Sequence, residues 1–209
     1  MSTATPVSTH DEREGKAPRR QMAGEDDGVP ADRRPALPPL AGEEHVCRSC
    51  PFSYADHDVD RASAVIAAIP ARARALFDSL DHATCRQPGP YGAWSAVEYL
   101  CHLRDVYATS TIRLHRARTE DDPALEPMLN DLRARRFGYR DAAVEPALDQ
   151  LQAHVVGFLA EIARLRPEDW GRPVHRLADE HRSARWLVRQ AAHEGVHHLR
   201  DITEVSRQH

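Results

Sequence analysis

Apolar residues recur at intervals of three and four along four stretches of the chain, a spacing typical of amphipathic helices. The first stretch contains Pro70, which removes a backbone hydrogen bond and predicts a kink or a split there. Extended runs that alternate apolar and polar residues, the pattern of half-buried strands, are missing. The hydrophobic pattern therefore predicts an all-α protein, with helices over 59–80, 94–118, 144–165 and 183–206.

Local signals support these helix boundaries. Ser95 and Glu98 have the spacing of a capping box, which predicts that the second helix starts there. A Pro-Gly-Pro sequence at 88–90 stops the first helix, and Pro167 ends the third. The connection 119–143 is long, and long connections in compact domains are often functional. Four helices joined by short and long connections predict a four-helix bundle.

Residues 1–44 differ in composition from the rest of the chain. They contain no aromatic residue, six of the fifteen prolines and clusters of mixed charge. Such a segment buries too little apolar surface to offset the entropy lost on ordering. The sequence therefore predicts a disordered tail over 1–44 and one helical domain over 45–209. The tail also lacks the apolar core of a secretory signal, so we expect a cytoplasmic protein.

Charge and composition limit the function classes. The chain has 209 residues, of which 28 are basic and 32 acidic, giving a net charge of -4. A general nucleic-acid binder is usually clearly basic, so no nucleic-acid partner is expected. No run approaches the ~18 apolar residues of a membrane span, so no membrane partner is expected. Lys16 is the one lysine among the basic residues, an arginine bias typical of GC-rich coding.

The predicted fourth helix carries candidate metal chemistry. His193 and His197 are four residues apart, so they share one helix face. Two imidazoles at this spacing can bind one divalent metal, and His102 on the second helix is the best candidate for a third ligand. His198 should point about 100° away from His197 and is not expected to be a ligand. The alternative is that these histidines are solvated or structural.

Two motifs carry a resemblance to a known family. One is W-S-x-x-E-Y-x-x-H over 94–102, and the other is H-E-G-V-H-H-L-x-D-I over 193–202. In this order, separated by a long insertion, they resemble the DinB-like metalloprotein superfamily, which is related to mycothiol-dependent transferases and isomerases. The resemblance covers residues 47–202 and implies an up-down-down-up four-helix bundle. It further implies a metal held by one histidine of the second helix and an H-x3-H pair of the fourth, here His102, His193 and His197.

The resemblance also implies a chemistry. Three imidazoles leave a divalent metal with open positions, which is the pattern of catalytic sites. A thiol bound there loses its proton and becomes a strong nucleophile. We therefore expect a metal-dependent enzyme that activates a low-molecular-weight thiol, mycothiol, for S-transfer to, or isomerisation of, an electrophilic small molecule. Zinc is the expected metal, with nickel or iron as alternatives.

A second constellation precedes the first helix. Cys47 and Cys50 form a C-x2-C, a frequent half of a tetrahedral zinc site, for which His45, His57 or Cys85 are the remaining candidates. Without an export signal, free thiols or metal ligands are expected rather than disulfides. The alternatives are a thiol redox switch and inert reduced cysteines that pack the start of the first helix.

No general base is assigned, and three carboxylates are candidates to orient an imidazole. Asp105 lies one turn after His102, and Glu194 and Asp201 lie on the fourth helix; each could instead be a surface ion pair. Two other function classes stay open: a non-catalytic metal-binding or stress-response protein, and a redox sensor that uses the two cysteines. A homodimer also stays open, because helical bundles of this size often pair.

Overall fold

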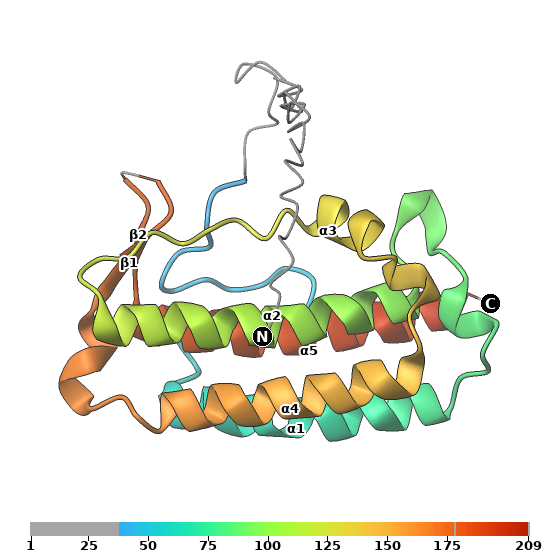
Figure 1. Ribbon diagram of the computed structural model, residues 1–209, viewed down its shortest axis with the longest axis horizontal. Coiled ribbons are helices and arrows are strands. Elements are labelled where there is room, and N and C mark those ends of the chain that lie inside the picture. Colours follow the sequence, from blue (N-terminus) through green and yellow to red (C-terminus); the bar gives the residue numbers. More distant parts are fainter. Residues whose placement is uncertain (1–37, 178, 209) are drawn as a thin grey trace, which may run out of the picture. The chain divides into compact units, whose positions relative to one another are not determined.

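Four long helices form the bundle in the computed structural model, which describes residues 38–177 and 179–208. They are α1 (Val59–Asp78), α2 (Ala96–Thr119), α4 (Val144–Ile162) and α5 (Ala184–Ser206). Figure 1 shows that α1 and α5 run in one direction and that α2 and α4 run in the other. The predicted four helices and the up-down-down-up bundle are therefore confirmed, with helix ends displaced by no more than three residues.

Each long helix packs against two others. α2 lies against α4 and α5, and α1 completes the ring by lying against the same two helices. The core between them contains large side chains that are almost fully buried, among them Trp186, Tyr107 and Phe158. α2 and α5, the two helices that carry the candidate histidines, are therefore neighbours over their length.

Side-chain caps fix where the helices start. The Ser95 backbone N–H donates to the Glu98 carboxylate at 2.9 Å, and the predicted capping box at the start of α2 is present. The N–H of Trp186 donates to the Ser183 hydroxyl at 3.1 Å and starts α5 in the same way. Such caps each stabilise a helix by about 1 kcal/mol. They set the position at which each helix begins relative to its histidines.

Pro70 does not split the first helix. α1 continues through it from Val59 to Asp78, and Pro70 is buried together with Ile69 and Ala73. A proline inside a helix costs about 3 kcal/mol because a hydrogen bond is lost. Burial of this apolar face against the neighbouring helices offsets that cost.

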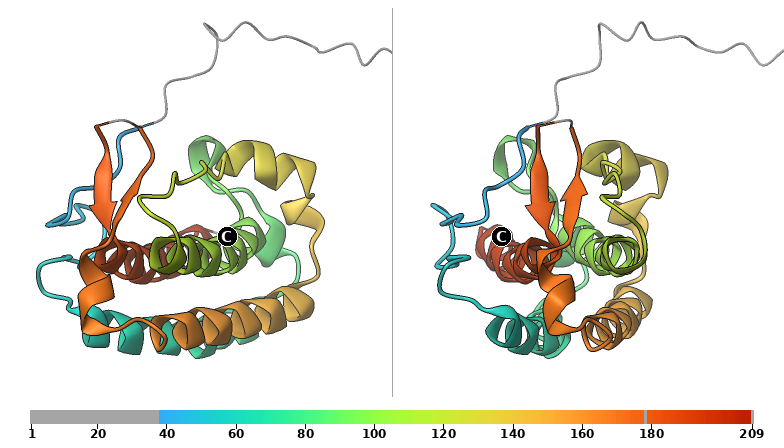
Figure 2. Two further views of the ribbon diagram at one scale, coloured as in Figure 1. Left: turned by 60° about the vertical axis from the view of Figure 1, so that its left-hand side comes forward. Right: turned by 90° about the vertical axis from the view of Figure 1, so that its left-hand side faces the viewer.

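The connections contain structure that the hydrophobic pattern does not reveal. Between α2 and α4 lie the short helix α3 (Asn130–Arg136) and a 3-10 turn at Tyr139–Asp141. Between α4 and α5, strands β1 (Pro173–His175) and β2 (His181–Ser183) pair as an antiparallel hairpin. Figure 2 shows this hairpin at the end of the bundle where α5 begins. Strands of three residues are too short to show the alternation that identifies a strand.

The segment before α1 lies on the bundle from residue 39 onward. Arg182 donates to the backbone carbonyls of Leu40 and Ala41, and the Ser183 N–H donates to the Glu43 carboxylate at 2.7 Å. Residues 39–44, which composition groups with the tail, therefore belong with the helical domain. The rest of the predicted disordered tail, residues 1–37, lies outside the described residues. Among the helices that the structure describes, none has the length and apolarity to cross a bilayer.

Candidate metal centre

One cluster of ligand atoms joins α2 to α5. Oε2 of Glu194 lies 3.0 Å from Nε2 of His198 and 3.6 Å from Nε2 of His102. One ligand atom from each of the three residues lies within 4.8 Å of the others, a spacing that one metal ion can span. We call these three residues, His102, Glu194 and His198, the interhelix cluster. It offers two imidazole nitrogens and a carboxylate oxygen.

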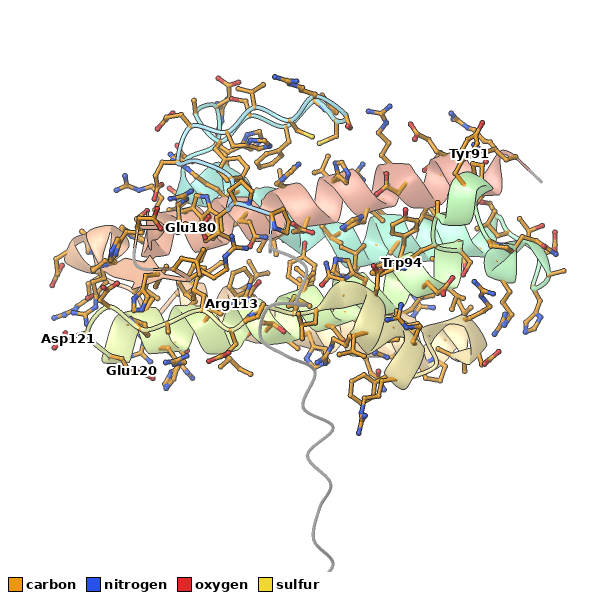
Figure 3. The ribbon with its side chains drawn as sticks, turned by 90° about the horizontal axis from the view of Figure 1, so that it is seen from above. Tyr91, Trp94, Arg113, Glu120, Asp121 and Glu180 are labelled. Atoms are coloured by element: carbon orange, nitrogen blue, oxygen red, sulfur yellow. The ribbon has the colours of Figure 1, made fainter. Side chains whose placement is uncertain are left out.

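Packing holds the interhelix cluster between the two helices. The side chain of His102 is 4% exposed, whereas those of Glu194 and His198 remain 24% and 15% exposed, so the cluster keeps contact with solvent through Glu194 and His198. The Trp94 ring, marked in Figure 3, packs edge-on against His102 at 5.2 Å, and the Tyr99 ring stacks on His198 at 5.4 Å. The two aromatic rings therefore form an apolar border around the polar atoms.

Gly195 allows α5 to approach its neighbours at this level. A Cβ atom on Gly195 would lie 2.8 Å from the Ile69 side chain on α1 and would also overlap the Tyr107 hydroxyl on α2. That hydroxyl donates to the Ala191 carbonyl of α5 at 3.2 Å. The absence of a side chain at Gly195 therefore brings Glu194 close enough to α2 to face His102.

Asp201 orients His198. The Nδ1–H of His198 donates to Oδ2 of Asp201 at 2.8 Å, which turns the Nε2 atom toward Glu194. A carboxylate on the second nitrogen of a ligating histidine fixes the ring and raises its basicity as a ligand. Of the three candidate orienting carboxylates, Asp201 therefore occupies that position for His198.

The interhelix cluster contains an ion pair between Glu194 and His198. Burial would raise the pKa of Glu194, but the nearby imidazoles of His102 and His198 hold it well below its usual range. Burial lowers the pKa of His102, whereas for His198 the contacts with Asp201 and Glu194 outweigh burial and raise the pKa to about 9. At neutral pH, without a metal, His198 is therefore protonated and paired with the anionic Glu194, whereas His102 is uncharged. A divalent metal at the cluster would take the place of the proton on Nε2 of His198.

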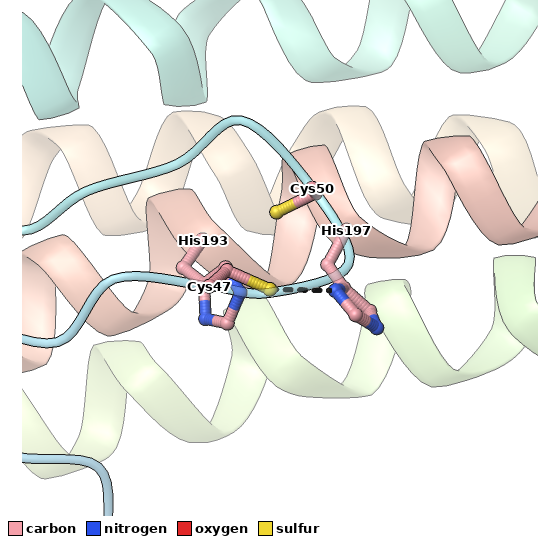
Figure 4. Close-up of side chains that lie close together, drawn as sticks. All are labelled: Cys47, Cys50, His193 and His197. Carbon is pink, nitrogen blue, oxygen red and sulfur yellow. Dashed lines mark hydrogen bonds between the residues drawn. The ribbon is translucent and has the colours of Figure 1, made fainter.

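A second cluster lies beside the first on α5. Ligand atoms of Cys47, Cys50, His193 and His197 lie within 4.8 Å of one another (Figure 4). Sγ of Cys47 is 3.5 Å from Nδ1 of His197, and the rings of His193 and His197 have centroids 5.4 Å apart. We call these four residues the Cys-His cluster.

The predicted ligand set His102, His193 and His197 is divided between the two clusters. The structure brings His193 and His197 together, but it places them with Cys47 and Cys50, and it groups His102 with Glu194 and His198. The spacing of four residues occurs twice on α5, at 193/197 and at 194/198. A search for paired histidines finds the first pair and misses the second, whose first member is a glutamate. The three-histidine set itself stays a prediction.

Asp105 contacts no imidazole among its described hydrogen bonds. Its carboxylate accepts from Arg104 at 2.8 Å, from Arg133 of α3 at 2.7 Å and from the Tyr139 hydroxyl. Burial would raise the pKa of Asp105, but these donors hold it below its usual range. Asp105 therefore holds the α2–α4 connection, through Arg133 and Tyr139, against α2. This matches the alternative role given for Asp105 above, an ion pair, rather than the orientation of an imidazole.

Two further features lie outside these two sets of ligands. Asp122, His175 and His181 form a third group of metal-spaced ligands at the hairpin, with Asp122 Oδ1 3.2 Å from His175 Nδ1. A groove of about 560 Å³ runs between α1 and α5 beside Pro51, with Arg72 and Arg200 in its walls. Arg200 there donates to Glu204 at 2.6 Å, as expected of an exposed arginine.

Comparisons with known proteins agree with this architecture. The family model of the DinB superfamily matches residues 66–202. A curated protein from Geobacillus thermodenitrificans, named "Putative metal-dependent hydrolase", is 25% identical over 122 residues, which cover 58% of this chain and 68% of that protein.

Solved structures show the same fold. YfiT from Bacillus subtilis, described as a probable metal-dependent hydrolase with an unusual four-helix bundle topology, has a TM-score of 0.69 at 19% identity, over 81% of this chain and 93% of its own. A mycothiol-dependent maleylpyruvate isomerase has a TM-score of 0.58 at 12% identity, over 71% of this chain and 62% of the isomerase. At these identities the structural likeness establishes the fold alone. The family match covers more than half of the sequence, and the chain belongs to the DinB superfamily.

Proposed function

We propose that this chain is a divalent-metal-dependent enzyme whose metal is held by the interhelix cluster, His102, Glu194 and His198. The observation that carries the proposal is that two imidazole nitrogens and one carboxylate oxygen converge from two neighbouring helices: Nε2 of His102, Oε2 of Glu194 and Nε2 of His198. Asp201 lies behind the His198 imidazole. Three protein ligands of this type are the pattern of catalytic rather than structural zinc sites. The name of the curated relative agrees with a metal-dependent activity.

The residues of the cluster suit a catalytic metal. A metal bound there would lower the pKa of a coordinated thiol or water and so supply a nucleophile at neutral pH. Glu194 supplies the negative charge, the buried His102 supplies an uncharged nitrogen, and Asp201 holds His198 in one orientation. The Trp94 and Tyr99 rings restrict water on one side, which strengthens the electrostatic effect of the charges.

For the reaction, we propose activation of a low-molecular-weight thiol that attacks an electrophilic small molecule, by S-transfer or by isomerisation. Zinc is the proposed metal and mycothiol the proposed thiol. The arginine bias of the sequence agrees with a GC-rich source, and one protein of the same fold is a mycothiol-dependent isomerase. A substrate reaches the cluster from the side on which Glu194 and His198 are exposed.

Hydrolysis is the second candidate. The curated relative and YfiT are both named as metal-dependent hydrolases, and a metal with three protein ligands has room for an attacking water. The two reactions differ in one requirement, because thiol activation needs a thiol co-substrate whereas hydrolysis does not.

The experiment compares wild type, Glu194→Gln and the exposed-histidine control His82→Ala, all purified without a histidine tag. Each is assayed with zinc, mycothiol and electrophiles such as maleylpyruvate, and with esters and amides in the absence of thiol. We expect metal-dependent turnover that requires mycothiol, lost by more than 100-fold in Glu194→Gln and unchanged in His82→Ala. Turnover without thiol would support hydrolysis, and turnover that survives in Glu194→Gln would contradict the proposed centre.

A further inference from the structure

We infer that Cys47, Cys50, His193 and His197 form a structural zinc site that fastens the loop before α1 to α5. The inference does not depend on the proposed function, because the Cys-His cluster shares no residue with the interhelix cluster. It concerns a second metal ion in the same chain, with a different ligand set and a different role.

The donor set is the first argument. Two thiols and two imidazoles are the ligands that structural zinc prefers, and their spacings here, C-x2-C and H-x3-H, are those of Cys2His2 sites. Ligands about 2.0–2.3 Å from one zinc ion lie at most about 4.6 Å apart. The four ligand atoms already lie within 4.8 Å of one another, although Cys47 and His197 are 150 residues apart in the sequence. Four protein ligands fill a tetrahedron, so this site has a structural role.

The loop is built to present its sulfur atoms. Residues 45–54 form a narrow turn in which Val46 pairs with Ser53, and the Cys47 N–H donates to the Phe52 carbonyl at 2.9 Å. The Ser49 N–H points at Sγ of Cys47, 3.4 Å away. Backbone N–H groups directed at a sulfur stabilise its thiolate form, which is the form that binds metal.

The imidazoles have outer partners that suit metal binding. Nδ1 of His193 lies 3.4 Å from the Tyr54 hydroxyl, whereas its Nε2 atom is buried and has no hydrogen-bond partner among the described residues. Buried polar atoms are nearly always satisfied, and coordination would satisfy this one. Nε2 of His197 lies 3.6 Å from Asp201, on the opposite side of the ring from Cys47. Each histidine therefore has one nitrogen for the metal and another for an outer polar group.

A zinc ion here would tie the two clusters together. Asp201 lies against His197 of the Cys-His cluster and against His198 of the interhelix cluster. Glu194 lies between His193 and His197 along α5. Closing the Cys-His cluster would therefore hold the turn of α5 that presents Glu194 and His198 to α2.

The test uses cobalt(II) as the probe, because thiolate-to-cobalt charge-transfer bands report sulfur ligands directly. The full chain is freed of metal and titrated with Co²⁺, alongside Cys47→Ser, Cys101→Ser and His102→Ala. We expect about one thiolate-bound cobalt per wild-type chain, loss of the bands in Cys47→Ser and retention in the other two. Cys101→Ser controls for loss of a buried thiol, and His102→Ala separates this site from the proposed catalytic centre.

A second measurement uses the unmodified chain and does not depend on how a variant folds. The wild-type protein, loaded with zinc, is titrated with an organomercurial thiol reagent while a chromophoric chelator records the zinc released. We expect release of about one zinc ion per chain as two thiols react. Any one of three results would overturn the inference: the absence of thiolate-to-cobalt bands in wild type, their persistence in Cys47→Ser, or the absence of zinc release when the thiols are modified. A Cys47–Cys50 disulfide in protein purified under reducing conditions would do the same and would favour a redox switch.

Discussion

Oδ2 of Asp201 lies 2.8 Å from Nδ1 of His198 and accepts its hydrogen bond. The same oxygen is 3.6 Å from Nε2 of His197, which belongs to the other cluster. Two consecutive histidines that point into different clusters are thus supported by one carboxylate. Asp201 is therefore in contact with a member of each cluster.

Replacing Asp201 by alanine should weaken metal binding without unfolding the bundle. Loss of a carboxylate behind a ligating histidine typically lowers metal affinity by 10–100-fold, which corresponds to about 1–3 kcal/mol of binding free energy. Competition with a chromophoric chelator measures the affinity, and circular dichroism checks the helix content. Glu204→Ala, one turn farther along α5 and paired with the exposed Arg200, is the matched control. Equal zinc affinity in Asp201→Ala and wild type would show that Asp201 does not support a ligand.

Asp105 should make the stability of the fold depend on acid. Its folded-state pKa lies below the usual value of about 3.9, because Arg104, Tyr139 and Arg133 hydrogen-bond to the carboxylate. Because the pKa is lowered by folding, the contribution of ionised Asp105 to the free energy of unfolding is fully present above pH ~4. It is lost as the pH falls through the folded-state pKa.

Asp105→Asn should accordingly reduce the free energy of unfolding at pH 7 by about 1–3 kcal/mol, since the buried side chain loses charged hydrogen bonds. The difference between variant and wild type should narrow below pH ~4. Urea unfolding at pH 7 and at acid pH measures both effects. A difference that stays constant across this range would rule out Asp105 ionisation as its source.

Gly195→Ala should destabilise the bundle even though alanine favours helices. The added methyl would meet Ile69 at 2.8 Å and overlap the Tyr107 hydroxyl, and such overpacking costs about 1–3 kcal/mol. The gain in helix propensity offsets about 1 kcal/mol of this. The same change should also move α5 away from α2 and weaken metal binding at the interhelix cluster.

Gly157→Ala is the matched control for that substitution. Gly157 lies inside α4, and a Cβ atom there has no neighbour within 4 Å among the described residues. Helix propensity alone then determines the change in the free energy of unfolding, and Gly157→Ala should be more stable than wild type by roughly 0.5–1 kcal/mol. Thermal unfolding of both variants distinguishes a packing effect from a propensity effect; equal stabilisation by both would show that α5 does not need a glycine.

The helices could be predicted because their signals are local. The spacing of apolar residues and the Ser95–Glu98 capping box depend on neighbours a few residues away, and both predictions are confirmed. The β1–β2 hairpin was not predicted because strands of three residues carry too little pattern. The docking of residues 39–44 depends on distant partners, Arg182 and Ser183, which composition does not reveal.

The sequence places candidate ligands on α2 and α5, but it does not decide between two ligand sets on α5. The pairs 193/197 and 194/198 have the same spacing and differ by a rotation of about 100°. The pair that faces His102 depends on how α5 is turned against α2, which the packing at Gly195 and Tyr107 decides. The position of Cys47 beside His197 likewise depends on contacts across 150 residues. These are tertiary relationships, and a single sequence does not encode them in any local pattern.

The most direct test counts metal ions in two double variants. Zinc content by elemental mass spectrometry is compared for wild type, His102→Ala with His198→Ala, and His102→Ala with His193→Ala. With one ion in each cluster, wild type should hold about two ions per chain, the first variant about one, and the second none. If the second variant instead retains as much zinc as the first or more, His102 shares its metal with His193, and the interhelix cluster of His102, Glu194 and His198 is contradicted.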